Sequence, residues 1–401
     1  MRTRAWGVIG AAYGDEGKGR TVDDIVAGLG GDAVVVRTNG GAQAGHTVVT
    51  PDGRRHVFHH VGSGTFAGAA THLSRFFVSH PMSLMQEVDA LADLGAMPAV
   101  SADPRGYVTT PWDMMVNQAL EVSRGGGRHG SCGYGLGETV GRCEDAGFPL
   151  TVADLSDPGL RDMLVRIRDE WLPARLDALE IGEAGRDFLR MADSEAVLDR
   201  FLDDCAMFAQ FVSVMPDASL GDGPMVVFEA AQGLLLDQVR GAFPFVTRSN
   251  TGVANMVSVA REAGIASLCV AYATRCYVTR HGRGPMIDER PLDAWFDIVD
   301  PTNAPNDWQE TIRHGLLDLG ALREAIVADL ADGDGLDIEW GLSLSCLDQA
   351  IGDVPMVRDG TVWSLPAAAV PAAMALATGA RWVRTSCGPS RPGALPCRMA
   401  A

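Results

Sequence analysis

The residues most able to do chemistry lie in a glycine-rich segment near the start of the chain, residues 8–22, VIGAAYGDEGKGRTV. An apolar run precedes it and an amphipathic run follows it, so we expect a strand, a glycine loop and a helix in that order. A helix N-terminus offers unpaired N–H groups and a partial positive charge, which together favour a phosphate. The loop also carries an acid, Asp15, beside Glu16 and Lys18. An acid would repel a phosphate unless it holds Mg²⁺ or moves a proton, so the loop predicts one of those roles for Asp15.

The loop differs from the two common nucleotide-binding loops. A Walker A loop needs glycine where this chain has Ala12, and it needs serine or threonine where Gly19 follows Lys18. The spacing is not GxGxxG either. Two interpretations therefore stay open for the segment alone: a phosphate loop, or a tight strand–helix turn with solvated charges.

A second polar glycine loop, RTNGGAQAGHTVV, follows a buried strand that we expect at residues 33–36. It contains Gly45 and His46 close to its end. A single histidine is more often structural than catalytic. This one follows the second strand, however, and sites in parallel α/β sheets lie at the carboxyl ends of strands. Structural and catalytic roles for His46 are therefore about equally favoured by the residues alone.

Three further loops are candidates for anion binding. Residues 124–142, RGGGRHGSCGYGLGETVGR, are either a disordered linker or an anion-binding loop that its ligand orders, and the arginines favour the second. Residues 229–233, EAAQG, follow an expected strand, and residues 247–252, TRSNTG, precede an expected helix. Hydroxyls, an arginine and a glycine ahead of a helix suit a phosphate.

The composition limits the class of protein. Lysine and arginine number 33 against 51 aspartates and glutamates, and the net charge of −18 argues against binding to nucleic acid or an acidic membrane. The eight cysteines include no CxxC pair, which fits a reducing compartment and neither a zinc site nor a disulfide framework. We find no signal-peptide region at the N-terminus and no apolar run long enough to span a bilayer, so we expect a cytoplasmic protein.

The order of the expected elements predicts an α/β fold with a large, mostly parallel central sheet flanked by helices. The chain is 47% hydrophobic and no repeat or low-complexity linker divides it, so we expect a single domain over residues 1–401. Residues 152–214 are charged and helical in period, and we expect a mainly helical insertion there. Residues 301–318 are expected to form an irregular loop that leads into a helix.

Taken in order, the motifs resemble those of the adenylosuccinate synthetase family. They are GDEGKG (14–19), GGAQAGHT (40–47), EAAQGLLLD (229–237), FPFVTRSNTG (243–252), YVTRHGRGP (277–285), the acid of SCLD (345–348) and GPSR (388–391). The resemblance spans nearly the whole chain and implies that family's P-loop-NTPase-like fold. It implies a ligase in which the γ-phosphate of GTP activates the 6-oxygen of a 6-oxopurine nucleotide such as IMP. The amine of L-aspartate then displaces the phosphate, Mg²⁺ is required, and the enzyme is a homodimer.

The resemblance also implies a role for each matching residue. Asp15 matches the base that takes the N1 proton of the purine and a ligand of Mg²⁺, and His46 matches the acid that stabilises the phosphoryl group. Lys18 matches a residue that holds the transferred phosphate, and the Gly45 carbonyl matches a second magnesium ligand. Arg142 matches the arginine that crosses to the neighbouring subunit. The other matches to nucleotide-binding positions are Gly14, Glu16, Gly17, Gly19, Gln43, Ser131, Gln232, Thr247, Asp348 and Gly388.

Two departures from the family pattern bear on the substrates. The guanine-binding block TKLD is replaced by SCLD, so its acid is kept as Asp348 while its lysine is lost, and ATP becomes an alternative to GTP. The aspartate-binding loop, rich in arginine in the family, corresponds to NDWQETIRHG, in which Arg313 is the one arginine. Either Arg280, Arg283 and Arg313 share the carboxylates of the amino acid, or the amino acid differs.

Three functional hypotheses follow from the resemblance. The first is a ligase that acts on IMP or a close analogue. The second is a (deoxy)guanylate-specific synthetase, as in a viral branch of the family, or an enzyme of a purine-antibiotic pathway. In that viral branch a small residue commonly replaces the acid of GDEGKG, and the retained Asp15 favours a substrate without a 2-amino group. The third is a catalytically inactive nucleotide-binding regulator, against which stand Asp15, Lys18 and His46.

Overall fold

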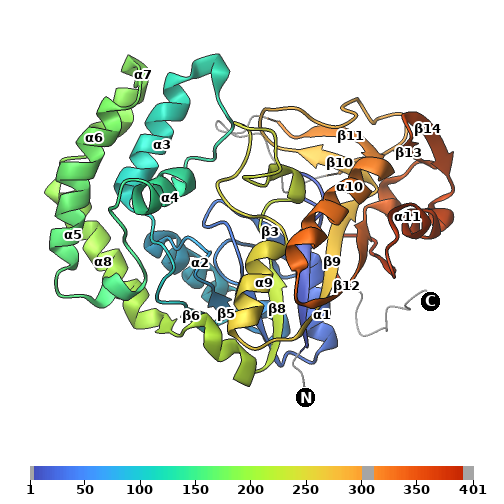
Figure 1. Cartoon of the computed structure of the whole chain (residues 1–401), viewed down its shortest axis with the longest axis horizontal. Coiled ribbons are helices and arrows are strands. Elements are labelled where there is room, and N and C mark those ends of the chain that lie inside the picture. Colours follow the sequence, from blue (N-terminus) through green and yellow to red (C-terminus); the bar gives the residue numbers. More distant parts are fainter. Residues whose placement is uncertain (1–3, 300–310, 392–401) are drawn as a thin grey trace.

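A parallel β-sheet forms the centre of the computed structural model, which describes residues 4–299 and 311–391 (Figure 1). Nine strands of this described part belong to the sheet, and all neighbouring strands in it are parallel. In spatial order they are β15 (Val383–Thr385), β12 (Asp337–Ser345), β9 (Ser267–Arg275), β1 (Arg4–Gly10), β8 (Met225–Glu229), β2 (Ala33–Arg37), β5 (Ala70–Leu73), β6 (Val100–Ala102) and β7 (Ser213–Val214). The predicted α/β class with a mostly parallel central sheet is confirmed.

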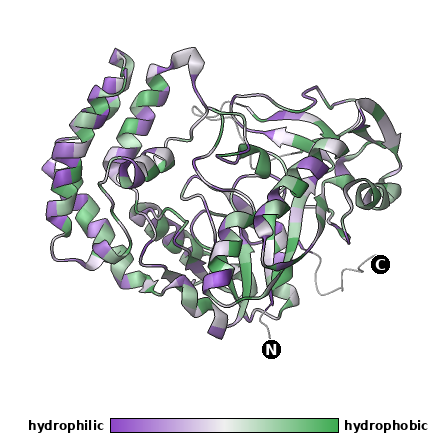
Figure 2. Ribbon diagram, in the orientation of Figure 1, coloured by the Kyte–Doolittle hydropathy of each residue, from purple (hydrophilic) through white to green (hydrophobic). Residues whose placement is uncertain are grey.

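Helices cover both faces of this sheet. Alternate residues of a strand point to opposite faces, so Val8 and Val35 pack against α1 while Ile9 and Val34 belong to the cluster that contains α9 and α10. Figure 2 shows the central strands as largely hydrophobic and the outer helices as mixed in hydropathy. The helices are α1 (Lys18–Gly28), α2 (Pro81–Asp93), α3 (Pro111–Ser123), α4 (Leu136–Glu144), α5 (Leu160–Arg166), α6 (Leu172–Asp177), α7 (Glu183–Arg186), α8 (Glu195–Phe211), α9 (Val253–Glu262), α10 (Leu319–Leu330) and α11 (Val370–Thr378).

A second apolar cluster lies beside the sheet, where α2, α3, α5 and α8 pack together (Figure 1). The fully buried Trp112 of α3 belongs to this cluster and donates its indole N–H to the Ala192 carbonyl at 2.8 Å. Residues 152–214, which we expected to be helical, contain α5 to α8 and end in the short strand β7. No helix in the described ranges is long and apolar enough to cross a membrane.

Two smaller sheets flank the central one. A hairpin is formed by β3 (His46–Val49) and β4 (Arg55–Phe58). The other consists of β10 (Tyr277–Arg280), β11 (Arg313–Asp318), β13 (Val354–Arg358) and β14 (Thr361–Leu365). The prediction of an irregular loop before a helix is wrong for β11, because its buried middle pairs with β10 on one side and β13 on the other. Residues 301–310 of that prediction lie outside the described residues.

Candidate active site

The glycine loop at the carboxyl end of β1 is closely packed against the loop that follows the neighbouring strand β8. Gly14 and Gly17 adopt positive φ angles of 96° and 83°, a conformation that favours glycine. A Cβ atom on Gly10 would lie 2.1 Å from Glu16 Oε2 and 2.5 Å from the Gln232 carbonyl oxygen. The strand, loop and helix expected from the sequence are all present, and two of the predicted loops meet at one edge of the sheet.

Glu16 serves the loop itself. Its carboxylate is 4% exposed, accepts a hydrogen bond from the Ala12 N–H at 2.5 Å and lies 3.8 Å from Lys18 Nζ. Burial raises the pKa of Glu16 to about 7, even though Lys18 and the Ala12 N–H favour the ionised form. Near neutral pH this carboxyl group therefore lies close to half ionisation, and it fixes the shape of the loop from the inside.

Asp15 directs its carboxylate into the cleft beside His281. Asp15 Oδ2 lies 2.9 Å from His281 Nε2, and Arg275 Nε donates to the Asp15 carbonyl at 2.5 Å. Burial alone would raise the pKa of Asp15, but the His281 hydrogen bond and the charges of Arg275 and Lys18 outweigh it, so the pKa lies below its ordinary value. Asp15 is thus ionised at neutral pH and has an acceptor available for a ligand.

His46 is held by a buried carboxylate. Its Nδ1 lies 2.6 Å from Glu229 Oε1, and Arg37 Nη1 lies 3.3 Å from the other oxygen of Glu229. Arg37 and His46 overcome the burial of Glu229 and lower its pKa to about 2, so Glu229 is ionised. Arg37 Nη1 also lies 3.0 Å from His46 Nδ1, but the shorter contact of 2.6 Å with an ionised carboxylate requires a donor, so we assign a proton to Nδ1. Burial, reinforced by Arg37, lowers the pKa of His46 to about 4 despite Glu229. His46 is therefore neutral in the free protein, with Nε2 left for the cleft.

The position of Glu229 is fixed by a turn that follows β4. The Ser63 hydroxyl lies 2.5 Å from Glu229 Oε1 and the Ser63 N–H lies 3.1 Å from Oε2. The same turn is anchored from α2, because the buried Glu87 carboxylate accepts the N–H groups of His59 and His60 at 2.8 and 2.7 Å. The turn therefore links α2 to the ring of His46, through Glu87 on one side and through Ser63 and Glu229 on the other.

The glycine-rich loop that leads to α4 is ordered around an internal carboxylate. Glu121, which is 1% exposed on α3, accepts the N–H groups of His129 and Gly130 at 3.1 Å each and that of Ser131 at 3.4 Å. Its other oxygen pairs with Arg124 at 2.6 Å. The sequence left a disordered linker or a ligand-ordered loop as alternatives, and the structure shows neither. The N–H groups that could bind an external anion already donate to the Glu121 carboxylate.

These loops surround a cleft of about 600 Å³. Arg275, His281 and Arg283 line it as well, and the sequence did not identify the first two as site residues. The predicted residues that line it are Gly14, Asp15, Glu16, Gly17, Lys18, Gly19, Gln43, Gly45, His46, Ser131, Gln232, Thr247 and Arg280.

Arg142 lies away from this cleft, inside the packing of α4. Its Nε and Nη2 each donate to the Asp113 carboxylate at 2.9 Å. Its Nη1 donates to the Phe148 carbonyl at 2.6 Å, and Nη2 also donates to the Val108 carbonyl at 2.9 Å. All three guanidinium nitrogens are bonded inside the chain and the side chain is fully buried, so this structure gives no support to the predicted role of Arg142 at a neighbouring subunit's site.

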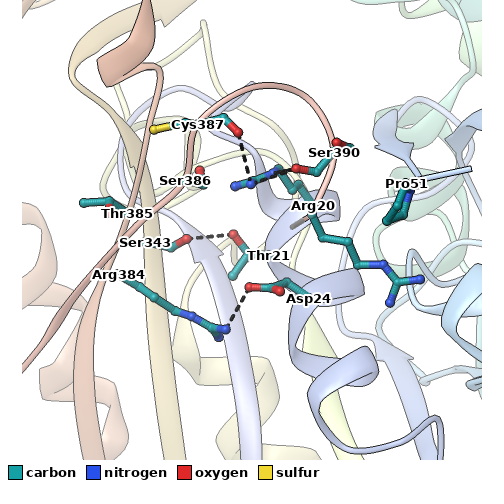
Figure 3. A pocket seen from close by; sticks show the side chains of 11 residues that line it. Arg20, Thr21, Asp24, Pro51, Ser343, Arg384, Thr385, Ser386, Cys387 and Ser390 are labelled. Carbon is teal, nitrogen blue, oxygen red and sulfur yellow. Dashed lines mark hydrogen bonds and ion pairs between the residues drawn. The ribbon is translucent and has the colours of Figure 1, made fainter. Parts of the chain in front are cut away.

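Asp348 and Gly388 meet each other beyond the carboxyl end of β12. Asp348 Oδ2 accepts the Gly388 N–H at 3.0 Å. A second pocket of about 390 Å³ lies next to Gly388, where Arg20 of α1 donates to the carbonyls of Ser390 at 2.9 and 3.1 Å and of Cys387 at 3.5 Å (Figure 3). Arg20 thereby ties the glycine-loop helix to the turn that contains Gly388.

The two arginines predicted for the amino acid are both engaged with the chain. Arg280 is 1% exposed, lies over the Tyr13 ring at 4.6 Å and donates to the Phe245 carbonyl at 3.1 Å. Arg313 pairs with Glu289 at 2.9 Å and is not among the residues that line the cleft. The structure therefore brings Arg280 to the cleft and leaves Arg313 outside it.

Several contributors were missed because only the fold brings them together. Glu229 had a detectable signal, since it is an acid at the carboxyl end of an apolar strand. The pairing of His281 with Asp15 had no detectable signal in the sequence, since the two residues are far apart along the chain. Glu121 had none either, because it lies in a helix whose apolar period indicates only packing.

Comparisons of the sequence with known proteins identify a family. A family model described as adenylosuccinate synthetase matches residues 7–333. The chain is 31% identical over 386 residues to the adenylosuccinate synthetase of Nitrosococcus oceani, which covers 90% of this chain and 84% of that protein. It is 33% identical over 296 residues to that of an Anaeromyxobacter species, which covers 70% of this chain and 64% of that protein.

Solved structures share the fold at low sequence identity. The fully ligated adenylosuccinate synthetase from Plasmodium falciparum has a TM-score of 0.73 at 17% identity, with 97% of this chain and 98% of that chain covered. The succinoaminodeoxyadenylate synthetase of cyanophage S-2L, bound to dGMP and to dATP as an energy donor, has a TM-score of 0.60 at 16% identity, with 97% and 94% covered.

Proposed function

The chain belongs to the adenylosuccinate synthetase family and is a ligase that forms a C–N bond, and from this premise we propose its substrates and mechanism. The phosphate acceptor is a 6-oxopurine nucleotide, IMP or a close analogue. A nucleoside triphosphate phosphorylates its O6, and L-aspartate then displaces that phosphate to give an adenylosuccinate-type product. The observation that carries the proposal is that Asp15 and His46 line the same cleft in opposite states, one ionised and one neutral.

Asp15 acts as the base in this proposal. The O6 oxygen of a 6-oxopurine becomes a competent nucleophile when the N1 proton is removed, and an ionised carboxylate is suited to take that proton. Its backbone is fixed by Arg275, and one oxygen of its carboxylate is fixed by His281, so the other is aimed without a large cost in side-chain entropy.

His46 supports the phosphoryl transfer. Charge on the transferred group is spread over its equatorial oxygens, and donors placed beside them stabilise the transition state. With Nδ1 held by Glu229, the ring can accept a proton on Nε2 when a phosphoryl group approaches, and it then becomes a cation between two anions. Lys18, which is 4% exposed at the start of α1, supplies a second positive charge at the same edge.

Asp15 and the Gly45 carbonyl are the groups that would hold Mg²⁺. Mg²⁺ prefers hard oxygen ligands and is usually bound by one or two protein oxygens together with substrate phosphates. Both residues line the cleft, so one carboxylate and one carbonyl oxygen are available there. When bound, the ion would neutralise phosphate charge in the cleft.

The phosphoryl donor is GTP or ATP, and its base lies beside Asp348 in this proposal. Binding of a guanine by a carboxylate uses both oxygens, for N1–H and the 2-amino group. One oxygen of Asp348 is engaged with the Gly388 N–H, and Cys346 stands where the family has a lysine. Both features lower the advantage of guanine over adenine. We also propose a homodimer, with a residue other than Arg142 completing the neighbouring site.

A phosphate-release assay tests the proposal. IMP, GMP and dGMP are each combined with GTP or ATP in the presence of L-aspartate and Mg²⁺, and an Asp15→Asn variant serves as the matched control. Turnover of IMP that is lost in the variant supports the proposal. Turnover of dGMP alone would overturn the substrate and place the chain with the (deoxy)guanylate synthetases. No phosphate release in any of the six combinations, with nucleotide binding intact by calorimetry, would favour an inactive nucleotide-binding regulator.

A further inference from the structure

We propose that His281 is a positioning residue that restricts Asp15 to purines with a single N–H donor on the edge next to O6. The inference rests on the proposed function and deepens it, because it assigns a residue that separates hypoxanthine from guanine nucleotides.

The contact with His281 engages one of the two oxygens of Asp15. His281 Nε2 lies 2.9 Å from Asp15 Oδ2, and the two side chains are 18% and 27% exposed where they line the cleft. In this inference the other oxygen, Oδ1, is the acceptor for the purine N1–H.

The segment that carries His281 also fixes the backbone of Asp15. Arg275, at the end of β9, donates to the Asp15 carbonyl at 2.5 Å. Thr279, in β10, lies within hydrogen-bond distance of the Gly14 carbonyl at 3.3 Å. One continuous stretch of chain therefore positions both the base and the histidine that binds it, and the two cannot shift independently.

The far side of the cleft holds His281 in place as well. Gly282 adopts a φ of +68°, and a Cβ on it would lie 3.4 Å from the Gly130 Cα. A Cβ on Gly130 would in turn lie 3.0 Å from the Gly282 Cα. The two backbones are in contact, and Arg283 donates to the Gly126 carbonyl next to this contact. The backbone next to His281 is therefore held in place from this side of the cleft.

The two candidate purines differ in the hydrogen-bond donors that they present to Asp15. Hypoxanthine presents N1–H alone, which one carboxylate oxygen satisfies. Guanine presents N1–H and a 2-amino N–H side by side, which match the two oxygens of a free carboxylate. The contact with His281 occupies part of the acceptor capacity of Oδ2, so a guanine 2-amino group must share that oxygen with the histidine. An oxygen that is already engaged satisfies a second donor less well, and this is the basis for discrimination.

The test compares His281→Leu, which removes the N–H, with His281→Gln, which keeps an N–H donor. The readout is the ratio of kcat/KM for IMP to kcat/KM for dGMP. We expect the ratio to fall about tenfold or more in His281→Leu and to stay near the parent value in His281→Gln, because a hydrogen bond to a charged group is involved. A purely structural role for His281 would lower both kcat/KM values together and leave the ratio unchanged.

The outcomes separate this inference from the proposed function. An unchanged ratio in a folded His281→Leu variant that still turns over IMP overturns the inference and leaves the function in place. A parent protein that prefers dGMP also overturns it. A parent protein inactive with every purine overturns the function itself. If the leucine variant does not fold, His281→Ala gives the same comparison, with the unfolding midpoint of each variant as the check.

Discussion

Replacement of His46 by asparagine is the sharpest test of the cleft. The side chain is 5% exposed, and its Nδ1 is committed to Glu229, so Nε2 is the atom that a substrate meets. The ion pair between Arg37 and Glu229, at 3.3 Å, and the bonds from Ser63 to Glu229 do not involve His46. The variant should therefore fold and keep its buried charges paired.

The size of the effect follows from the electrostatics of the site. The pKa of His46 is about 4, so placing a proton on Nε2 at pH 7 costs about 4 kcal/mol, at about 1.4 kcal/mol for each pH unit between 4 and 7. A phosphoryl charge about 4 Å away, at an effective dielectric constant of about 20, returns about 4 kcal/mol. With nucleotide bound, the protonated and neutral forms of His46 are then close in free energy, as general acid catalysis requires. Removal of the imidazole should therefore lower kcat by about 10²–10⁴-fold.

Steady-state kinetics at saturating nucleotide measure this loss, with His59→Asn as the matched control. His59 lines the same cleft, but its Nδ1 lies 3.0 Å from the Ala42 carbonyl, so it is turned to the backbone. We expect the KM values of both variants to stay within about threefold of the parent, and kcat to fall only in His46→Asn. An unchanged kcat with a raised KM for the nucleotides would refute the electrostatic reasoning, as would an equal loss in His59→Asn.

Three other substitutions test the roles of buried groups. Arg142→Met removes one side of a buried ion pair with α3, so denaturant unfolding should show a loss of about 3–5 kcal/mol in the free energy of unfolding. Gly10→Ala places a Cβ 2.1 Å from Glu16 Oε2 and should abolish measurable nucleotide binding in calorimetry, whereas Gly28→Ala, where no atom lies within 4 Å, should bind as the parent does. Burial lowers the pKa of His80 to about 4, so the folded state binds fewer protons than the unfolded state between pH 4 and 6.5 and loses stability as the pH falls. His80→Asn keeps a side-chain acceptor at the start of α2 and should lose up to about 3 kcal/mol less than the parent on acidification from pH 7 to 4, as measured by urea midpoints.

The sequence predicted the parts of the site that depend on local chemistry. Asp15 and His46 were proposed from their place in glycine loops after apolar strands and from the family resemblance, and the structure places both in one cleft. The fold then brings the two loops together by the rule that the carboxyl ends of parallel strands share one edge. This works for β1, β2 and β8, which are neighbours in the sheet.

The features that the sequence did not predict depend on contacts between distant segments of the chain. Arg142 lies in a glycine-rich segment with other arginines, which suggested an exposed, anion-binding residue. The segment turns into α4 instead, and the helix directs Arg142 at Asp113. Likewise β11 is a strand because β10 and β13 lie beside it, and its own residues are too few to show an alternating pattern.

The carboxylate of Glu121 has a thermodynamic consequence for ligand binding. A loop that folds around a ligand pays its ordering entropy at the binding step, and burial of the loop adds a large negative heat-capacity change. Here Glu121 already orders the segment that contains Ser131, so that entropy is lost during folding of the protein. Titration calorimetry at several temperatures should therefore give a heat-capacity change that accounts for the surface of the nucleotide alone. Glu121→Gln would weaken the internal contacts and move part of the ordering back to the binding step, which would make that heat-capacity change more negative.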